Sequence, residues 1–303
     1  MAQTEDPLRG IALHSGATVL FAVADTTAKY LSVSLPVIEI QWIRYVLFFG
    51  LAVLLARRMP LRALRPNNPK LQILRGLAVT GSSVLFVFGV RQMSMAEATT
   101  ISFLSPLLIT ILSIPLLGEV VGFRRWGAVL VGMLGVLIVV RPGTGGFQPA
   151  AFWGMASSFC WATALIITRK ISTSDQATTT LLCSAGIGAV VLTFLAPLAW
   201  TWPTASQWGL VLMLGVLSSL GQWMVILAHR QAPASLLAPF SYSQLIWAIG
   251  TGFIVFGALP DHWTLVGAAV IVASGLYTAH RERERRKLGR RTIRATSVFR
   301  IPD

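Results

Sequence analysis

The chain has 303 residues and a mean hydropathy of +0.70, with 54% hydrophobic and only 12% charged residues. Soluble domains carry about 25% charged residues, so this composition excludes an ordinary water-soluble protein. The formal net charge of +14 suggests an anionic partner, and the position of the charges decides between nucleic acid and lipid.

Apolar runs of about 20 residues, the length that a helix needs to cross a bilayer, follow one another along the chain. They are too long, and alternate too little, for the strands of an outer-membrane barrel. We therefore expect an all-α integral membrane protein with ten transmembrane helices. The expected helices are 10–31, 37–57, 74–92, 97–117, 123–141, 150–169, 177–199, 206–228, 233–256 and 263–280.

Positive charge gathers in two segments that share one side of the membrane in this topology. The 57–75 linker carries six basic residues and no acidic one, and the tail 281–303 carries nine basic against three acidic residues. The positive-inside rule then places both termini in the cytoplasm, in agreement with an even number of crossings. We interpret the tail as an anchor on anionic lipid, worth about 1 kcal/mol per basic residue, and not as a nucleic-acid site.

The start of the chain does not resemble a cleavable signal peptide. Glu5 and Asp6 stand where a signal peptide has basic residues, and no small-residue cleavage site follows. We expect the first helix to be retained in the mature protein.

The two halves of the chain resemble each other with a period of about 140 residues. Segment 96–103 matches 233–240, and segment 27–32 matches 167–172. Five helices per copy is an odd number, so the second copy must cross the membrane in the opposite direction. Inverted repeats of this kind are typical of transporters that hold substrate near the bilayer midplane. The expected divisions are a cytoplasmic N-terminus (1–9), a first repeat (10–141), an inverted second repeat (150–280) and a basic cytoplasmic tail (281–303).

Polar residues line one face of the first predicted helix, where charged groups are costly and therefore indicate function. They are His14, Thr18, Asp25 and Lys29, with Phe21 on the same face. Asp25 and Lys29 form an i,i+4 pair in the stabilising order. This pair is either a substrate or proton site in a cavity, or a neutralised pair whose Lys29 reaches the outer interface. Possible proton carriers are His14, Asp25 and Glu39.

Aromatic, hydroxyl and amide side chains near mid-membrane predict the chemistry of a binding cavity. Such a lining suits a flat, partly apolar solute and not a bare ion. For any single Ser or Thr, interhelical hydrogen bonding worth about 0.6 kcal/mol is the alternative. The candidate substrate-binding residues are Phe21, Asp25, Ser82, Phe86, Ser102, Phe103, Trp161, Gln222, Trp223, Tyr242, Gln244 and Trp247, with Pro106 and Pro239 as candidate hinges.

Small residues follow one face of the fifth and tenth predicted helices. Gly127 and Gly135 return as Gly267 and Gly275, and such spacing lets helix backbones approach closely. We interpret these faces as internal packing or as a homo-oligomer contact. No metal or cofactor is expected, because the two cysteines have no metal-ligand spacing and no phosphate-binding loop for ATP is present.

Two motifs resemble the EamA-type repeat of the drug/metabolite transporter superfamily. The first is the segment 98–106 followed by Leu117-Gly118-Glu119, and the second is the segment 234–240 followed by Gly257. The resemblance implies ten helices in inverted repeats, a central cavity, cytoplasmic termini and alternating access in a bacterial inner membrane. Among family members, the chain is most similar to aromatic amino acid exporters. It departs from a symmetric pattern because Ala258 stands where the first copy has Glu119.

The sequence thus favours a secondary transporter that exports small amphipathic metabolites, chiefly aromatic or apolar amino acids. A carrier of polyamines or lipids is the alternative within the same class. An integral-membrane lipid enzyme is disfavoured because its site requires clustered His or carboxylate residues, and the four histidines at 14, 229, 262 and 280 are scattered. A non-transporting sensor or assembly protein would bind a ligand without moving it.

Overall fold

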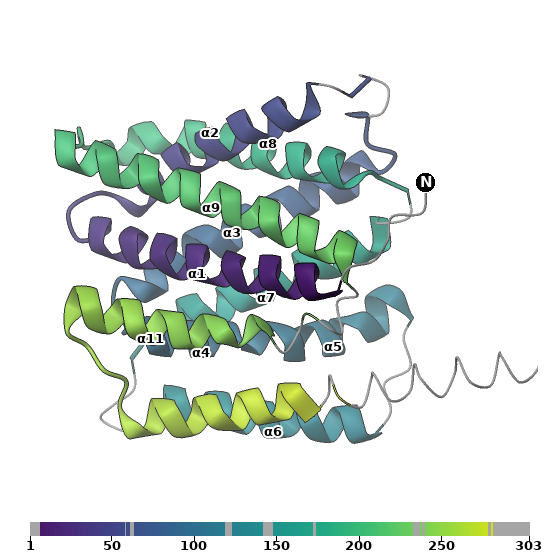
Figure 1. Ribbon diagram of the computed structural model, residues 1–303, viewed down its shortest axis with the longest axis vertical. Helices are drawn as coiled ribbons and strands as arrows, with labels where there is room; N and C mark the ends of the chain where they lie inside the picture. The colour runs from purple at the N-terminus through teal and green to yellow at the C-terminus, as the bar shows by residue number, and fades with distance from the viewer. Residues whose placement is uncertain are drawn as a thin grey trace, which may run out of the picture.

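The protein is described by a computed structural model, which places residues 7–57, 59–60, 64–118, 123–141, 148–171, 174–232, 237, 240–277 and 280. These residues contain helices and connections but no strand. In Figure 1 the helices lie side by side along a common direction. They are α1 (Pro7–Leu31), α2 (Val37–Ala56), α3 (Pro69–Val90), α4 (Met95–Ser102), α5 (Leu104–Leu117), α6 (Phe123–Val140), α7 (Ala151–Ile171), α8 (Ala177–Leu195), the short η2 (Ala196–Ala199), α9 (Ala205–Gln231), α11 (Ser243–Phe256) and a C-terminal helix (His262–Tyr277).

The described helices have the length and surface of a membrane bundle. Seven helical stretches are long and apolar enough to cross a bilayer, counting α4–α5 and α8–η2 as one stretch each, and three shorter apolar helices accompany them. Large apolar side chains such as Phe194 and Ile254 are 77% and 81% exposed on the outside of the bundle. A surface of this kind is suited to lipid and not to water.

The third helix begins five residues earlier than expected. Pro69 lies in its first turn, where a missing N–H leaves no hydrogen bond unmade. Arg75, which the sequence analysis placed in a basic linker, is therefore inside α3. The prediction that Arg75 belongs to a cytoplasmic loop is wrong, since its guanidinium reaches Thr168 on α7.

The fourth expected helix is broken at Phe103 into α4 and α5. Pro106 is the third residue of α5, where a backbone N–H is not needed by the helix. Because Pro106 has no N–H, the carbonyl of Ser102 four residues earlier accepts the Ser105 hydroxyl instead. Pro115 is the proline inside α5.

Helices from the two halves pack against each other in reciprocal pairs. Along α1 and α9, Gly10 lies against Ala232 and Phe21 lies against Gly221, so the two helices are antiparallel. The first helix of the first half (α1) thus meets the third helix of the second half (α9). In the same way, the third helix of the first half (α3) packs on the first helix of the second half (α7).

The antiparallel contact of α3 with α7 is equally close. Gly81 faces Cys160, and Gly89 approaches the backbone of Gly154. Between these pairs, α2 packs along α8, where Tyr45 lies against Gly188. Glycine at these points lets helices approach more closely than any larger residue would allow.

The glycine faces of α6 and the C-terminal helix meet inside the chain. A Cβ on Gly135 would lie 2.9 Å from the carbonyl oxygen of Gly267, and a Cβ on Gly267 would lie 2.6 Å from that of Gly135. Arg141 and Asp261 close this contact with an ion pair of 2.7 Å. Around Gly135 and Gly267 these small-residue faces are therefore internal packing surfaces. A Cβ at Gly127 would meet no described side chain within 4 Å, and oligomerisation through these two helices stays a prediction.

Candidate functional site

Three side-chain hydrogen bonds join α1 to the segment that leads into and forms α11. They link His14 Nε2 to Ser241 Oγ (2.9 Å), Thr18 Oγ1 to Ser243 Oγ (3.0 Å) and Thr26 Oγ1 to Thr251 Oγ1 (2.7 Å). The partners advance together along both helices, so α1 and α11 are parallel here. We call this row of polar contacts, together with Asp25, the α1 seam.

Asp25 is the acidic residue of the α1 seam, and it is only 9% exposed. No described residue donates a hydrogen bond to its carboxylate. The charge that acts on it is Arg44 of α2, which lies beyond ion-pair distance. A carboxylate so placed is costly in a membrane protein and indicates function.

Lys29 does not pair with Asp25, which corrects the expected i,i+4 ion pair. Its Nζ donates to the carbonyl oxygen of Met93 at 2.6 Å and lies 4.8 Å from the centroid of the Phe256 ring. Met93 lies in the turn between α3 and α4, where carbonyl groups lack helical partners. Lys29 therefore ties the ends of α1, α3 and α11 together and leaves Asp25 without a neutralising partner.

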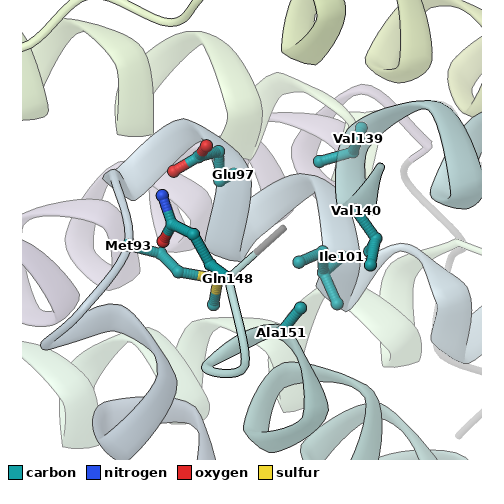
Figure 2. A pocket seen from close by; sticks show the side chains of 7 residues that line it. All are labelled: Met93, Glu97, Ile101, Val139, Val140, Gln148 and Ala151. Carbon is teal, nitrogen blue, oxygen red and sulfur yellow. The ribbon is translucent and has the colours of Figure 1, made fainter. Parts of the chain in front are cut away.

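A small pocket with a cavity volume of about 10 Å³, room for roughly one water molecule, lies beside this end of the α1 seam. Figure 2 shows the Glu97 carboxylate and the Gln148 amide facing each other across it. Its lining comes from the α3–α4 turn, α4, the end of α6 and the start of α7. The lining residues are Met93, Glu97, Ile101, Val139, Val140, Gln148 and Ala151.

Several predicted site residues do come together. The rings of Phe103 and Tyr242 meet edge to face with centroids 5.0 Å apart, joining the α4–α5 break to the start of α11. The Tyr242 hydroxyl fills the space left by Gly275. Phe86 packs against both large apolar clusters of the core. These aromatic contacts link the two halves of the chain.

Two predicted hydroxyls have structural partners. Ser82 Oγ and Ser157 Oγ are 3.1 Å apart, and Ser157 also donates to the Ser82 carbonyl. Ser102 donates to the carbonyl of Ala98 in its own helix. The first pair joins α3 to α7, so interhelical packing accounts for these groups.

The remaining predicted residues are spread out. Trp247 is 42% exposed on the outside of α11, and the candidate hinge Pro239 lies outside the described residues. Four other predicted residues are half-buried and make no hydrogen bond or ring contact with any described residue. They are Trp161, Gln222, Trp223 and Gln244.

Glu39, the third suggested proton carrier, anchors a connection. It is fully buried in the first turn of α2, and its Oε2 accepts a hydrogen bond of 2.9 Å from the backbone N–H of Thr201. Its Oε1 has no hydrogen-bond partner in the described structure. Glu39 therefore holds the segment before α9 and does not belong to the α1 seam.

A second polar group, which the sequence analysis missed, lies among α3, α7 and α8. Arg75 donates to Thr168 Oγ1 at 2.6 Å and to Ser184 Oγ, while Gln72 donates to Asp175 Oδ2 at 2.7 Å. We call these five residues, with Thr180, the α3–α8 network. The available signal was an arginine at the junction of the expected linker (57–75) and the expected helix (74–92).

Asp175 in the α7–α8 connection has its charge stabilised by this network. Partial burial alone would raise its pKa, but hydrogen bonds from Gln72 and Asn67 outweigh burial and lower the pKa below the ordinary value of 3.8. Within the described residues, no group of three or more His, Cys, Asp or Glu side chains gathers as a metal site would require.

Comparison with known proteins places this bundle among membrane transporters. The chain is 29% identical to the S-adenosylmethionine uptake transporter of Rickettsia bellii over 86% of this chain and 89% of that protein. It is 28% identical to the riboflavin transporter of Vibrio cholerae, over 90% and 94%. It is 26% identical to the pseudopaline exporter CntI of Pseudomonas aeruginosa, over 88% and 94%.

A solved crystal structure shares the fold, with a TM-score of 0.62 at 19% identity over 90% of this chain and 98% of that chain. Residues 8–141 and 148–278 each match the EamA-like transporter family. The matched segments cover both halves of the chain and all the helices described above, so the protein belongs to the EamA-like transporter family.

Proposed function

We propose that the protein is an inner-membrane secondary transporter that exports small amphipathic metabolites, chiefly amino acids with aromatic or apolar side chains. The single observation that carries this proposal is Asp25, a buried carboxylate without a hydrogen-bond donor, on a seam between the two halves. A transporter must move polar groups past such a point, whereas a purely structural bundle has no use for an uncompensated charge.

Alternating access is the proposed mechanism, with two inverted five-helix repeats that rock about the seam. Helix directions support the inversion. Gln41 on α2 bonds to Ser83 on α3, and Tyr45 meets Thr80 beside Gly188, so α2 and α3 are antiparallel. α1 is also antiparallel to α2, and α7 is antiparallel to α3. The first helices of the two halves, α1 and α7, therefore run in opposite directions. The seven long and three shorter apolar helices match a ten-helix count.

Both termini are proposed to face the cytoplasm. The basic residues between α2 and α3 (Arg57, Arg58, Arg62 and Arg65) and the basic tail support this orientation, and in Figure 1 the start of α1 and the end of the C-terminal helix lie at the same end of the bundle. Lys29 and the pocket beside it are then at the periplasmic end. Phe103, where the fourth helix breaks, and the prolines 106 and 239 are proposed flexible points.

Asp25 is proposed to carry the coupling proton or to meet the cationic group of the substrate. His14 lies on the same seam and could pass a proton towards the cytoplasmic end. Glu39 is proposed as a third proton carrier, because its Oε1 has no hydrogen-bond partner among the described residues. The aromatic residues Phe21, Trp161 and Trp223 are proposed to stack on the apolar part of the solute.

The test is transport of labelled phenylalanine by purified protein in liposomes, with the gradient imposed from either side. Wild-type protein is expected to move the label faster than empty liposomes, and preferentially from the side that corresponds to the cytoplasm. A Trp161→Ala/Trp223→Ala double variant that transports normally would contradict the stacking role. Absence of transport for every amphipathic solute tried would overturn the proposal.

Uptake of S-adenosylmethionine is a second candidate, favoured by relatives of that name at 26–29% identity. The same liposomes separate the two candidates. Inward movement of labelled S-adenosylmethionine would support uptake, and its competition with phenylalanine would show that both solutes use one site. Putrescine and a labelled phospholipid serve as tests of the polyamine and lipid alternatives.

A further inference from the structure

The end of α11 is fastened to α1 and to the α3–α4 turn by a small set of contacts. Thr26 Oγ1 donates to Thr251 Oγ1 at 2.7 Å. Lys29 Nζ donates to the carbonyl oxygen of Met93 at 2.6 Å and lies 4.8 Å from the centroid of the ring of Phe256, the last residue of α11. We call these five residues the latch. The pocket beside the latch has room for roughly one water molecule, so an organic solute does not fit there while the latch is closed.

The contacts of the latch are weaker than those of the α3–α8 network. A single hydroxyl pair contributes little to the association of membrane helices. The Lys29 ammonium, on a flexible four-carbon stem that can exchange partners, bonds to one carbonyl oxygen among the described residues. Arg75, by contrast, donates to three groups on α7 and α8. Of these two contacts between the halves of the chain, the latch therefore requires less free energy to open.

Asp25 stands one helical turn before Lys29 and offers its ammonium a second position. The Asp25 side chain is 9% exposed, and no described residue donates a hydrogen bond to it. Side chains at i and i+4 share a helix face, and the acid-first order is the stabilising one. Rotation about the bonds of the Lys29 side chain can therefore move the ammonium from the Met93 carbonyl to the Asp25 carboxylate while α1 stays intact. Glu97 also acts electrostatically on Lys29, but its Oε2 accepts the N–H of Ser94.

We propose that Lys29 occupies these two positions in turn and so links the occupancy of Asp25 to the opening of this end, which is periplasmic in the proposed orientation. While Asp25 holds a cation, either a proton or the ammonium group of a solute, Lys29 stays on Met93 and Phe256 and the latch is closed. When the cation leaves, Lys29 moves to the charged carboxylate and releases the α3–α4 turn and α11. This inference rests on the proposed function, in which Asp25 carries that cation.

The two positions of Lys29 set the order of the transport cycle. An unneutralised carboxylate inside the membrane is costly, so the latch closes only when another cation has replaced the one that left Asp25. Closure then returns Lys29 to the Met93 carbonyl. Release of one solute at the periplasmic end is thereby coupled to the entry of a proton or of a second cationic group.

Cysteine labelling tests the latch directly, without relying on transport. Thr26 is 4% exposed, so Thr26→Cys reacts with a water-soluble maleimide only when the latch opens. The reporter is placed in a chain whose two natural cysteines are replaced by serine, and labelling is measured in detergent, where both ends are accessible. We expect Lys29→Met to raise the labelling rate about tenfold or more, as for loss of a hydrogen bond from a charged group. Lys29→Arg, which keeps the charge, should label slowly.

Asp25→Asn distinguishes a two-position lysine from a static one. A neutral amide does not attract Lys29 from Met93, so Asp25→Asn should label more slowly than the parent protein. In the Lys29→Met background the same substitution should change nothing, because the residue that responds to Asp25 is gone. A cysteine at Ser113, which is 2% exposed on α5, serves as the matched control for general loosening and should label slowly in every variant.

Several results would overturn the inference. They are an unchanged labelling rate in Lys29→Met, an effect of Asp25→Asn that is the same with and without Lys29, and a parallel rise in the labelling of Ser113→Cys. Transport in liposomes is measured separately. If wild-type protein moves no solute, the proposed function fails, whereas transport combined with any of these labelling results leaves the transporter and removes the latch.

Discussion

The α1 seam and the α3–α8 network both place charged side chains inside an apolar bundle, but they differ in how those charges are satisfied. In the network, Arg75 and Asp175 each have several hydrogen-bond partners from neighbouring elements. In the seam, Asp25 has none within the described structure, although hydroxyl pairs surround it. A charge with complete partners stabilises the helix contact, whereas a charge without them is available to a solute or a proton.

The 140-residue period sharpens this difference. The position on α7 that corresponds to Asp25 is Leu165, and Ser157 and Ser158 of α7 bond to backbone carbonyls of α3 and α4. The α7 counterpart of the seam is thus satisfied and free of titratable groups at these positions. Duplication preserved the packing of both halves, while the acidic group stands in only one of them.

Replacing Asp25 should produce the largest effect on transport. We expect Asp25→Asn to reduce transport to background while the thermal midpoint stays equal or rises, because a neutral amide is less costly to bury than an unpartnered carboxylate. Transport in liposomes and unfolding in detergent measure the two effects. Asp25→Glu, which keeps the charge, should retain measurable transport. Normal transport by Asp25→Asn would remove the distinction between the two regions.

Arg75 should show the opposite pattern. Arg75→Met removes donors that join α3 to α7 and α8, so we expect the free energy of unfolding to fall by about 1–3 kcal/mol. The transport rate per folded molecule should stay near the wild-type value. Thermal unfolding of purified protein, with Arg75→Lys as the conservative control, tests this. Loss of transport without loss of stability would place Arg75 in the transport machinery.

Asp175 predicts a pH dependence of stability. Because its folded-state pKa is lowered, the charged form contributes stability at neutral pH, and this contribution is lost as pH falls below the ordinary value of 3.8 and through the lowered folded value. The thermal midpoint of wild-type protein should therefore drop more steeply than that of Asp175→Asn between pH 6 and about pH 3. Parallel curves for the two proteins would contradict the assigned role of the network.

Ser82 should have the smallest effect. Its bond to Ser157 joins two helices, so Ser82→Ala is expected to lower stability by about 0.6 kcal/mol and to leave the KM for phenylalanine unchanged. A raised KM would show that the α3–α7 contact opens to substrate during the transport cycle.

Much of the fold could be predicted from residue patterns. Apolar runs located most of the helices to within a few residues, because the bilayer fixes their length, although α11 begins at Ser243 and not at the expected residue 233. The boundary at α3 was missed because Pro69 begins a helix whose first two turns carry the charged residues Lys70 and Arg75. The break at Phe103 was missed although Pro106 follows it closely and cannot donate a hydrogen bond to the Ser102 carbonyl four residues earlier.

The candidate site was only partly predictable. Asp25, His14 and Thr18 were identified by their shared helical face, which depends only on spacing. Lys29 was assigned the wrong partner because sequence spacing reports neighbours on one helix, while the Met93 carbonyl comes from another. Glu97 and Gln148 were not proposed, since a capping residue and a connection residue become a pocket only when α4, α6 and α7 meet.

The sequence by itself determined that this chain is a duplicated helical membrane protein and which helix carries the acidic group, because hydropathy and periodicity are local properties. The tertiary structure decided which charges are satisfied. Hydrogen-bond partners such as Thr168 for Arg75 and Met93 for Lys29 lie 93 and 64 residues away, and only packing brings them within reach or, at Asp25, leaves the carboxylate without them.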